Sequence, residues 1–118
     1  MNLSRSGLAF MHTNHYTHHD GLVCDYTVLP RPFFTIATIL RGEADFEQNG
    51  STFHVSKGDA LFIPFRACYR SCWYGNPTAE LISCHFQLPS ASPPVRDRFF
   101  HIQKLTDDGF ISSTLQNL

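Results

Sequence analysis

The chain has 118 residues and a mass of 13.4 kDa, which suits one domain with a single core. Nine Lys and Arg stand against ten Asp and Glu, so the net charge is −1. This balance argues against direct nucleic-acid binding, which needs a basic face. Hydrophobic residues make up 42% and aromatic residues 14%, a composition that excludes a disordered chain.

The N-terminal region carries neither an export signal nor a membrane span. The sequence has no run of about 20 apolar residues, the length that crosses a bilayer, and the short apolar stretch near residue 8 is no signal peptide. We therefore expect a cytoplasmic protein. In that compartment we expect the four cysteines to be reduced thiols and not disulfides; they are Cys24, Cys68, Cys72 and Cys84.

Short β-like runs separated by turns follow one another along the chain. Asn49-Gly50 lies between two alternating segments and predicts a hairpin. The expected strands are residues 22–28, 33–40, 43–48, 51–56, 60–63, 68–74 and 79–88, with 99–105 as a further extended segment. Strands at roughly ten-residue spacing indicate an antiparallel sandwich or barrel. No helical pattern separates them, so a parallel βαβ architecture is excluded.

The composition changes after the last of these strands. Residues 89–98 are rich in proline and serine and predict a linker. Residues 107–118 predict the start of a helix, capped by Asp107 or Asp108 and carrying an apolar side with Leu115. We expect this helix to continue in a longer protein. The alternative is a helix that frays at a natural end.

One turn carries a recognisable motif with two residues replaced. Gly58, five residues, Pro64, one residue, Arg66, two residues and Tyr69 resemble the second motif of the cupin barrels, in which the last two positions are glycine and histidine. The place of the first cupin motif, at residues 29–35, holds no histidine. Transition metals bind imidazole, carboxylate or thiolate, so we expect a barrel with no metal and no other cofactor.

A longer stretch resembles the N-terminal ligand-sensing domain of the AraC/XylS family of bacterial transcription regulators. The matching features, in chain order, are Arg31-Pro32, Arg41-Gly42, Gly50, Phe53, Gly58-Asp59, Pro64 and the closing "CHFQLP" at 84–89. The resemblance covers about residues 17–90. It implies an all-β antiparallel double-stranded β-helix (an RmlC-like jelly roll) that binds a small effector.

The resemblance also implies a domain organisation. Residues 1–16 would form an N-terminal arm, 17–90 the effector-binding barrel, and 91–118 a linker with the start of a dimerisation helix. A homodimer is implied, and DNA would be bound only by a C-terminal helix-turn-helix domain absent from this chain.

Four candidate ligand contacts come from the resemblance or from side-chain chemistry. The family's contacts fall on Thr17, Arg31, Leu81 and Ser83, and the matching arginine holds a sugar in one member. Arg31 offers five donors in a rigid fork, which suits sugar hydroxyls or a carboxylate. The alternative role for Arg31 is an ion pair with a surface acid such as Asp25.

Strand alternation supplies further candidates. Tyr69 takes the place of the missing histidine, and Trp73 then faces the same side as a stacking surface or as plain core. Leu81, Ser83 and His85 share a face of the last strand, where His85 contacts ligand or serves the structure alone.

A cluster of histidines precedes the first expected strand. His12, His15, His18, His19 and Asp20 could form a zinc site, although the arm resembles a segment that folds over bound effector in the family. We expect no native metal there.

The sequence therefore favours an effector-sensing domain without enzymatic activity, binding a sugar or a sugar derivative. Its expected ligand-binding residues are Thr17, Arg31, Tyr69, Trp73, Ser83 and His85. The rival hypothesis is a small metal-independent cupin enzyme, such as a sugar isomerase or epimerase. That enzyme needs a general base, and only His54 and His85 lie on the expected strands, with no carboxylate partner in view.

Overall fold

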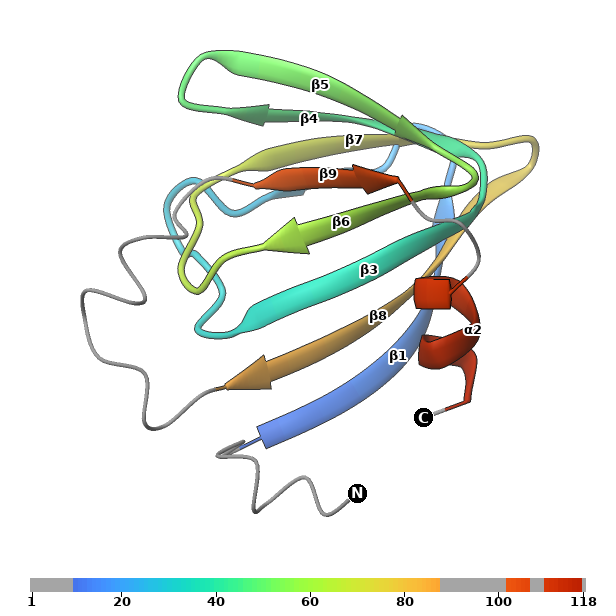
Figure 1. Ribbon diagram of the computed structural model, residues 1–118. Coiled ribbons are helices and arrows are strands. Elements are labelled where there is room, and N and C mark those ends of the chain that lie inside the picture. The colour runs from blue at the N-terminus through green and yellow to red at the C-terminus, as the bar shows by residue number, and fades with distance from the viewer. Residues whose placement is uncertain (1–9, 88–101, 107–109, 118) are drawn as a thin grey trace.

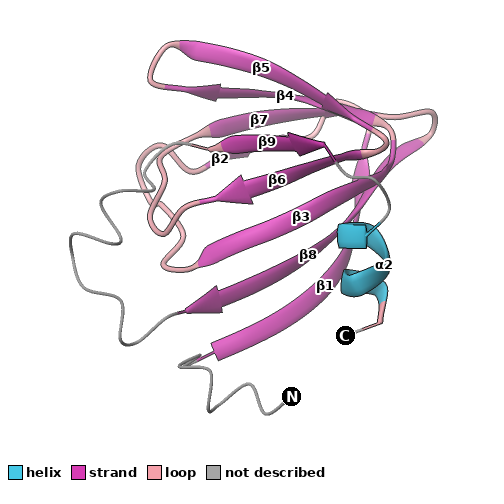
Figure 2. Cartoon of the chain, in the orientation of Figure 1, coloured by secondary structure: helices cyan, strands magenta, loops and turns pink. Residues whose placement is uncertain are grey.

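The computed structural model describes residues 10–87, 102–106 and 110–117, and strands make up most of these residues (Figures 1 and 2). Each strand coincides with a stretch of alternating or β-branched residues or forms by pairing with a neighbouring strand. The elements are β1 (Phe10–His19), β2 (Val23–Asp25), β3 (Phe34–Arg41), β4 (Glu43–Gln48), β5 (Ser51–Ser56), β6 (Asp59–Ile63), β7 (Arg70–Tyr74), β8 (Thr78–Gln87), β9 (Gln103–Thr106) and α2 (Phe110–Gln116).

The strands form two antiparallel sheets that enclose the core. One sheet has the order β1-β8-β3-β6-β9 and the other the order β2-β7-β4-β5. In Figure 1 the β4–β5 hairpin closes over one side of the larger sheet, and α2 lies beside that larger sheet. The all-β antiparallel jelly roll expected from the sequence is confirmed.

The hairpin predicted at Asn49-Gly50 is also confirmed. Asn49 has a φ of 53° and Gly50 a φ of 79°, and Gln48 pairs with Ser51 across the turn. Two central residues with positive φ are what a two-residue hairpin turn requires.

The first strand differs from the expectation. Residues 10–16, assigned above to an arm, form most of β1, which pairs with β8 along its whole length from Phe10↔Gln87 to His19↔Thr78. The strand was missed because its inward-facing positions carry Asn14, Tyr16 and His18 in place of aliphatic residues. A search for alternating apolar residues does not detect such a strand.

The C-terminal region also contributes to the barrel. β9 pairs with β6 beyond the expected barrel boundary at residue 90, and Ile102 is buried with its N–H donating to Gln48 Oε1 at 2.9 Å. α2 packs on β8 and β3 through the buried Leu115. The expected caps Asp107 and Asp108 lie outside the described residues. In the part of the chain that the structure describes, no helix is long and apolar enough to cross a membrane.

Candidate functional site

A cavity of about 80 Å³ lies between the two sheets. Its walls come from both sheets and from the segment before β3, since alternate residues of each strand face the same interior. Aromatic rings dominate the lining. The lining residues are Tyr16, His18, Cys24, Tyr26, Arg31, Thr35, Ala37, Phe46, Leu61, Ile63, Tyr69, Ser71, Trp73, Leu81, Ser83 and His85.

Arg31 brings a half-buried guanidinium to one end of this cavity. Its Cζ lies 4.6 Å from the centre of the Phe33 ring and 5.3 Å from that of Tyr26, close enough for cation–π attraction. The guanidinium also hydrogen-bonds Tyr69. The backbone of Arg31 is fixed from the neighbouring loop, because Arg66 N–H donates to the Arg31 carbonyl at 3.1 Å.

The alternative role for Arg31, an ion pair with a surface acid, is not observed. Among the described residues no ion pair involves Arg31. Asp25 Oδ1 instead accepts from Thr27, at 3.0 Å from its N–H and 2.6 Å from its hydroxyl. The Arg31 charge is therefore directed to the cavity with aromatic rings around it.

Tyr69 occupies the position at which the cupin motif carries histidine, and its side chain is buried. Burial raises the pKa of Tyr69, while the Arg31 guanidinium acts in the opposite direction. The phenol therefore stays protonated at neutral pH. It can offer one O–H donor beside Arg31.

His85 lies at the centre of a polar network on the opposite wall. Its Nε2 is 3.0 Å from the Tyr16 hydroxyl and its Nδ1 is 2.8 Å from Thr35 Oγ1. Asn14 Nδ2 donates to the Tyr16 oxygen at 3.1 Å, so the Tyr16 proton is free to go to His85 Nε2. Nδ1–H then donates to Thr35.

The environment of His85 keeps the imidazole neutral. Burial, the Arg31 guanidinium and His12 together lower the pKa of His85 to about 4. The His85 ring also lies 4.4 Å from that of Phe33, and the Phe33 ring in turn contacts Arg31. A neutral imidazole next to a cation shows that this end of the cavity already disfavours a second positive charge.

Trp73 lies at the other end of the cavity. It is 3% exposed, and its indole N–H donates to Ser71 Oγ at 3.0 Å. The His18 ring lies 4.9 Å from the indole, and the Phe46 ring meets it edge-on at 5.8 Å. Since its N–H is satisfied internally, Trp73 presents apolar ring surface to the interior.

The structure brings five of the six expected ligand residues to one cavity. Arg31, Tyr69, Trp73, Ser83 and His85 all line it. Thr17 does not line the cavity, because it is exposed on β1. Its neighbours Tyr16 and His18 line the cavity instead, as strand alternation requires.

Sequence reasoning included His18 only among the arm histidines that could touch a ligand, and it missed Tyr16, Cys24 and Tyr26 as lining residues. Cys24 and Tyr26 are two residues apart in the predicted strand "LVCDY", and this alternation indicates that both side chains face the same side. The histidines of β1 do not assemble into a metal site. Within the residues that the structure describes, no group of three or more His, Cys, Asp or Glu is placed to hold a metal ion.

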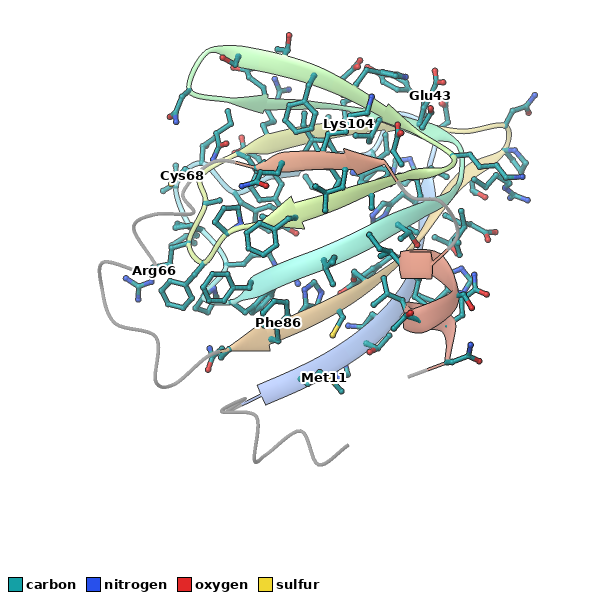
Figure 3. The ribbon with its side chains drawn as sticks, viewed as in Figure 1. Met11, Glu43, Arg66, Cys68, Phe86 and Lys104 are labelled. Atoms are coloured by element: carbon teal, nitrogen blue, oxygen red, sulfur yellow. The ribbon has the colours of Figure 1, made fainter. Side chains whose placement is uncertain are left out.

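Figure 3 places Arg66 on the outside of the barrel, pointing away from it. Its φ of 58° lies in the left-handed region that favours glycine, the residue of the cupin motif at this position. Arg66 therefore adopts a backbone conformation that suits glycine. In this turn the Arg66 N–H donates to the Arg31 carbonyl.

No protein-family model matches the sequence, and no curated protein matches it. Solved structures do match in fold, among them a Cupin 2 conserved barrel domain protein from Salinispora arenicola (12% identity, 75% of this chain and 69% of that chain, TM-score 0.55). The fold is that of a cupin.

Another cupin-like match is ToxT from Vibrio cholerae bound to an unsaturated fatty acid, with 8% identity, 92% of this chain covered and a TM-score of 0.69. A second ToxT structure holds (E)-4-(8-methylnaphthalen-1-yl)but-3-enoic acid and matches with 9% identity, 65% coverage and a TM-score of 0.55. This chain spans 45% of the first ToxT chain and 30% of the second.

Proposed function

We propose that this cupin is the effector-sensing domain of a bacterial transcription regulator of the AraC/XylS type. The observation that carries the proposal is the cavity itself, an aromatic chamber with one guanidinium and a set of satisfied hydroxyls. The sequence resemblance at residues 17–90 supports it. So does the likeness in fold to ToxT, which holds a small organic acid inside a longer chain.

The proposal extends to the parts of the protein beyond the barrel. A cytoplasmic homodimer would form through helices that follow α2, and DNA would be bound by a C-terminal domain outside this chain. Thr17 remains a proposed contact only for a ligand that reaches the outer side of β1, whereas Arg31, Tyr69, Trp73, Ser83 and His85 are proposed as contacts within the cavity.

An enzyme is the weaker proposal because the cavity lacks a pair of groups for acid–base chemistry. His85 has a lowered pKa, but both of its ring nitrogens bond hydroxyls, and no described cavity-lining residue is a carboxylate that could orient it as a base. The arrangement fits binding better than turnover.

Thermal unfolding against a mixed panel of neutral sugars, sugar acids and aromatic or unsaturated acids tests the function. A ligand at about 100 times its Kd stabilises the fold by about 2.7 kcal/mol, which raises the Tm by roughly ten degrees. We expect at least one compound of the panel to raise the Tm by about this amount and to be recovered chemically unchanged after incubation. Conversion of a bound compound to product would contradict a purely sensing role.

A further inference from the structure

The electrostatics of the cavity indicate the chemical class of its ligand. Of the described lining residues, Arg31 carries the one side chain that is fully charged at neutral pH, and none is Asp, Glu, Asn or Gln. Sugar hydroxyls need partners that accept as well as donate, which acidic and amide side chains commonly supply. This lining is rich in rings and hydroxyls instead.

The guanidinium is costly to place in such a site without a counter-charge. A half-buried charge has lost part of its hydration and is stabilised by a counter-charge, and none of the described residues forms an ion pair with Arg31. Its described partners are the faces of Phe33 and Tyr26 and the Tyr69 hydroxyl. A carboxylate that accepts the planar fork would complete the site.

The strand register separates the cavity into a charged end and an apolar end. Thr35 pairs with His85 at the level next to Arg31, whereas Ile39 pairs with Leu81 further along β3. On the opposite sheet Trp73 pairs with Ala44, so Trp73 lies away from the Arg31–Tyr69 contact. His85 and Leu81, which both line the cavity, are four residues apart on β8, a span of about 13 Å along the strand.

We infer that the cavity binds an organic monocarboxylate with a flat, unsaturated body, its carboxylate on Arg31 and its body directed along β3 to Trp73. This inference rests on the proposed function and narrows it, because a neutral sugar would leave the Arg31 charge without a partner. The Tyr69 hydroxyl donates to the same carboxylate. The Tyr16 hydroxyl and the two ring nitrogens of His85 bond each other and Thr35, so they line this end of the cavity without offering the carboxylate a further donor.

Matched pairs of acid and neutral analogue test this inference. The probes are trans-cinnamate with trans-cinnamamide, 2-naphthoate with 2-naphthamide, and glucuronate with glucose, each measured by isothermal titration calorimetry on the whole 118-residue chain. We expect the two aromatic acids to bind at least about tenfold more tightly than their amides, the difference that one charge-assisted contact provides. We expect glucose to bind more weakly than either acid.

Two arginine variants separate the Arg31 contact from general charge. Arg31→Gln is expected to remove the preference for acid over amide. Arg66→Gln makes the same change in charge on the neighbouring loop, where the side chain is exposed, and should keep the preference. Trp73→Leu is expected to weaken the binding of acid and amide by a similar factor, because the indole ring contacts the body of the ligand that both probes share.

Each result decides between the ligand class and the function. Equal binding of acid and amide by the wild-type chain, or tighter binding of glucose, would overturn the inference while leaving a ligand-binding cavity. Failure of both acids and neutral probes to bind would overturn the inference and the proposed function together. The wild-type comparison decides the ligand class even if Arg31→Gln does not fold.

Discussion

At the scale of single residues, His85 shows how a buried polar group is kept in one state. Its two ring nitrogens bond Tyr16 and Thr35, and its ring lies tilted against Phe33, near the Arg31 charge. Protonation would place a second cation against Arg31. The pKa of His85 therefore depends on the charge at this end of the cavity.

This environment predicts how stability depends on pH. The pKa of His85 is lowered to about 4 in the folded chain, against an ordinary value near 6.5. Between these two values His85 is protonated in the unfolded chain and neutral in the folded chain, which favours unfolding. Stability from His85 is present above about pH 6.5 and is lost as the pH falls towards 4. The Tm should therefore fall over this window.

His85→Gln isolates the contribution of this one group. The histidines that remain, including His18 with its lowered pKa and His54 with its raised pKa, are shared by both proteins. We expect the variant to show a shallower fall in Tm between pH 6.5 and 4.5, measured by differential scanning calorimetry. Parallel pH profiles for the two proteins would show that His85 is not held neutral.

The residues of the site show what sequence can reveal. Arg31, Tyr69 and Trp73 were predicted because resemblance and strand alternation both depend on local spacing, which the fold preserves. Tyr16 was missed, and His18 was expected only in an arm, because they belong to a strand whose inward face is polar. The position of Thr17 was off by one residue, and in a strand one residue changes the face.

At the scale of elements, Gly42 forms the corner at which the chain passes from one sheet to the other. β3 ends at Arg41 in the larger sheet and β4 begins at Glu43 in the smaller one. Gly42 has a φ of 84°, and a Cβ there would lie 2.6 Å from the Tyr74 carbonyl and 2.7 Å from the Ala79 Cβ. The corner between β3 and β4 therefore packs directly against β7 and β8.

Gly42→Ala should therefore destabilise the protein more than the matched Gly50→Ala. Gly50 has a similar φ of 79°, but a Cβ there would meet nothing within 4 Å. We expect about 1–2 kcal/mol of lost stability at Gly50 from the backbone alone, and about 3 kcal/mol or more at Gly42, where the clash adds. Urea unfolding measures both, and equal losses would mean that the corner relaxes freely.

Elements could be predicted where local chemistry specifies them, as at the Asn49-Gly50 hairpin. β9 was expected only as an extended segment, because its four residues form a strand by pairing with β6 and burying Ile102. β2 is shorter than the run 22–28 suggested, since only Val23–Asp25 pair with β7. In both cases tertiary pairing decides the outcome rather than propensity.

At the scale of the whole molecule, the barrel is completed by residues far along the chain. β9 adds a strand beside β6, and Leu115 of α2 is buried against β8 and β3 (Figure 1). The structural unit therefore extends beyond residue 90. Residues 102–106 and 110–116 belong to this unit.

A chain ending at residue 90 tests this view of the domain. Loss of the buried Ile102 and Leu115 side chains alone removes about 3–6 kcal/mol, which is comparable to the stability of a small domain. A chain ending at residue 106 keeps β9 and should therefore retain more of the stability of the full chain. Thermal unfolding of the two chains checks the order, and equal Tm values would show that β9 is dispensable.

The central claim is that a small molecule binds between the sheets, in contact with Trp73. Trp73 is the single tryptophan of the chain, so its fluorescence reports on the cavity without labelling. The decisive measurement is a titration of this emission with the matched pair trans-cinnamate and trans-cinnamamide, excited at the red edge of the indole absorption, where the cinnamoyl group absorbs least, and corrected for the remaining ligand absorption. The account predicts a saturable change that Trp73→Phe removes and that Arg31→Gln weakens for the acid. A linear response, equal in the wild type and in Arg31→Gln, would contradict it.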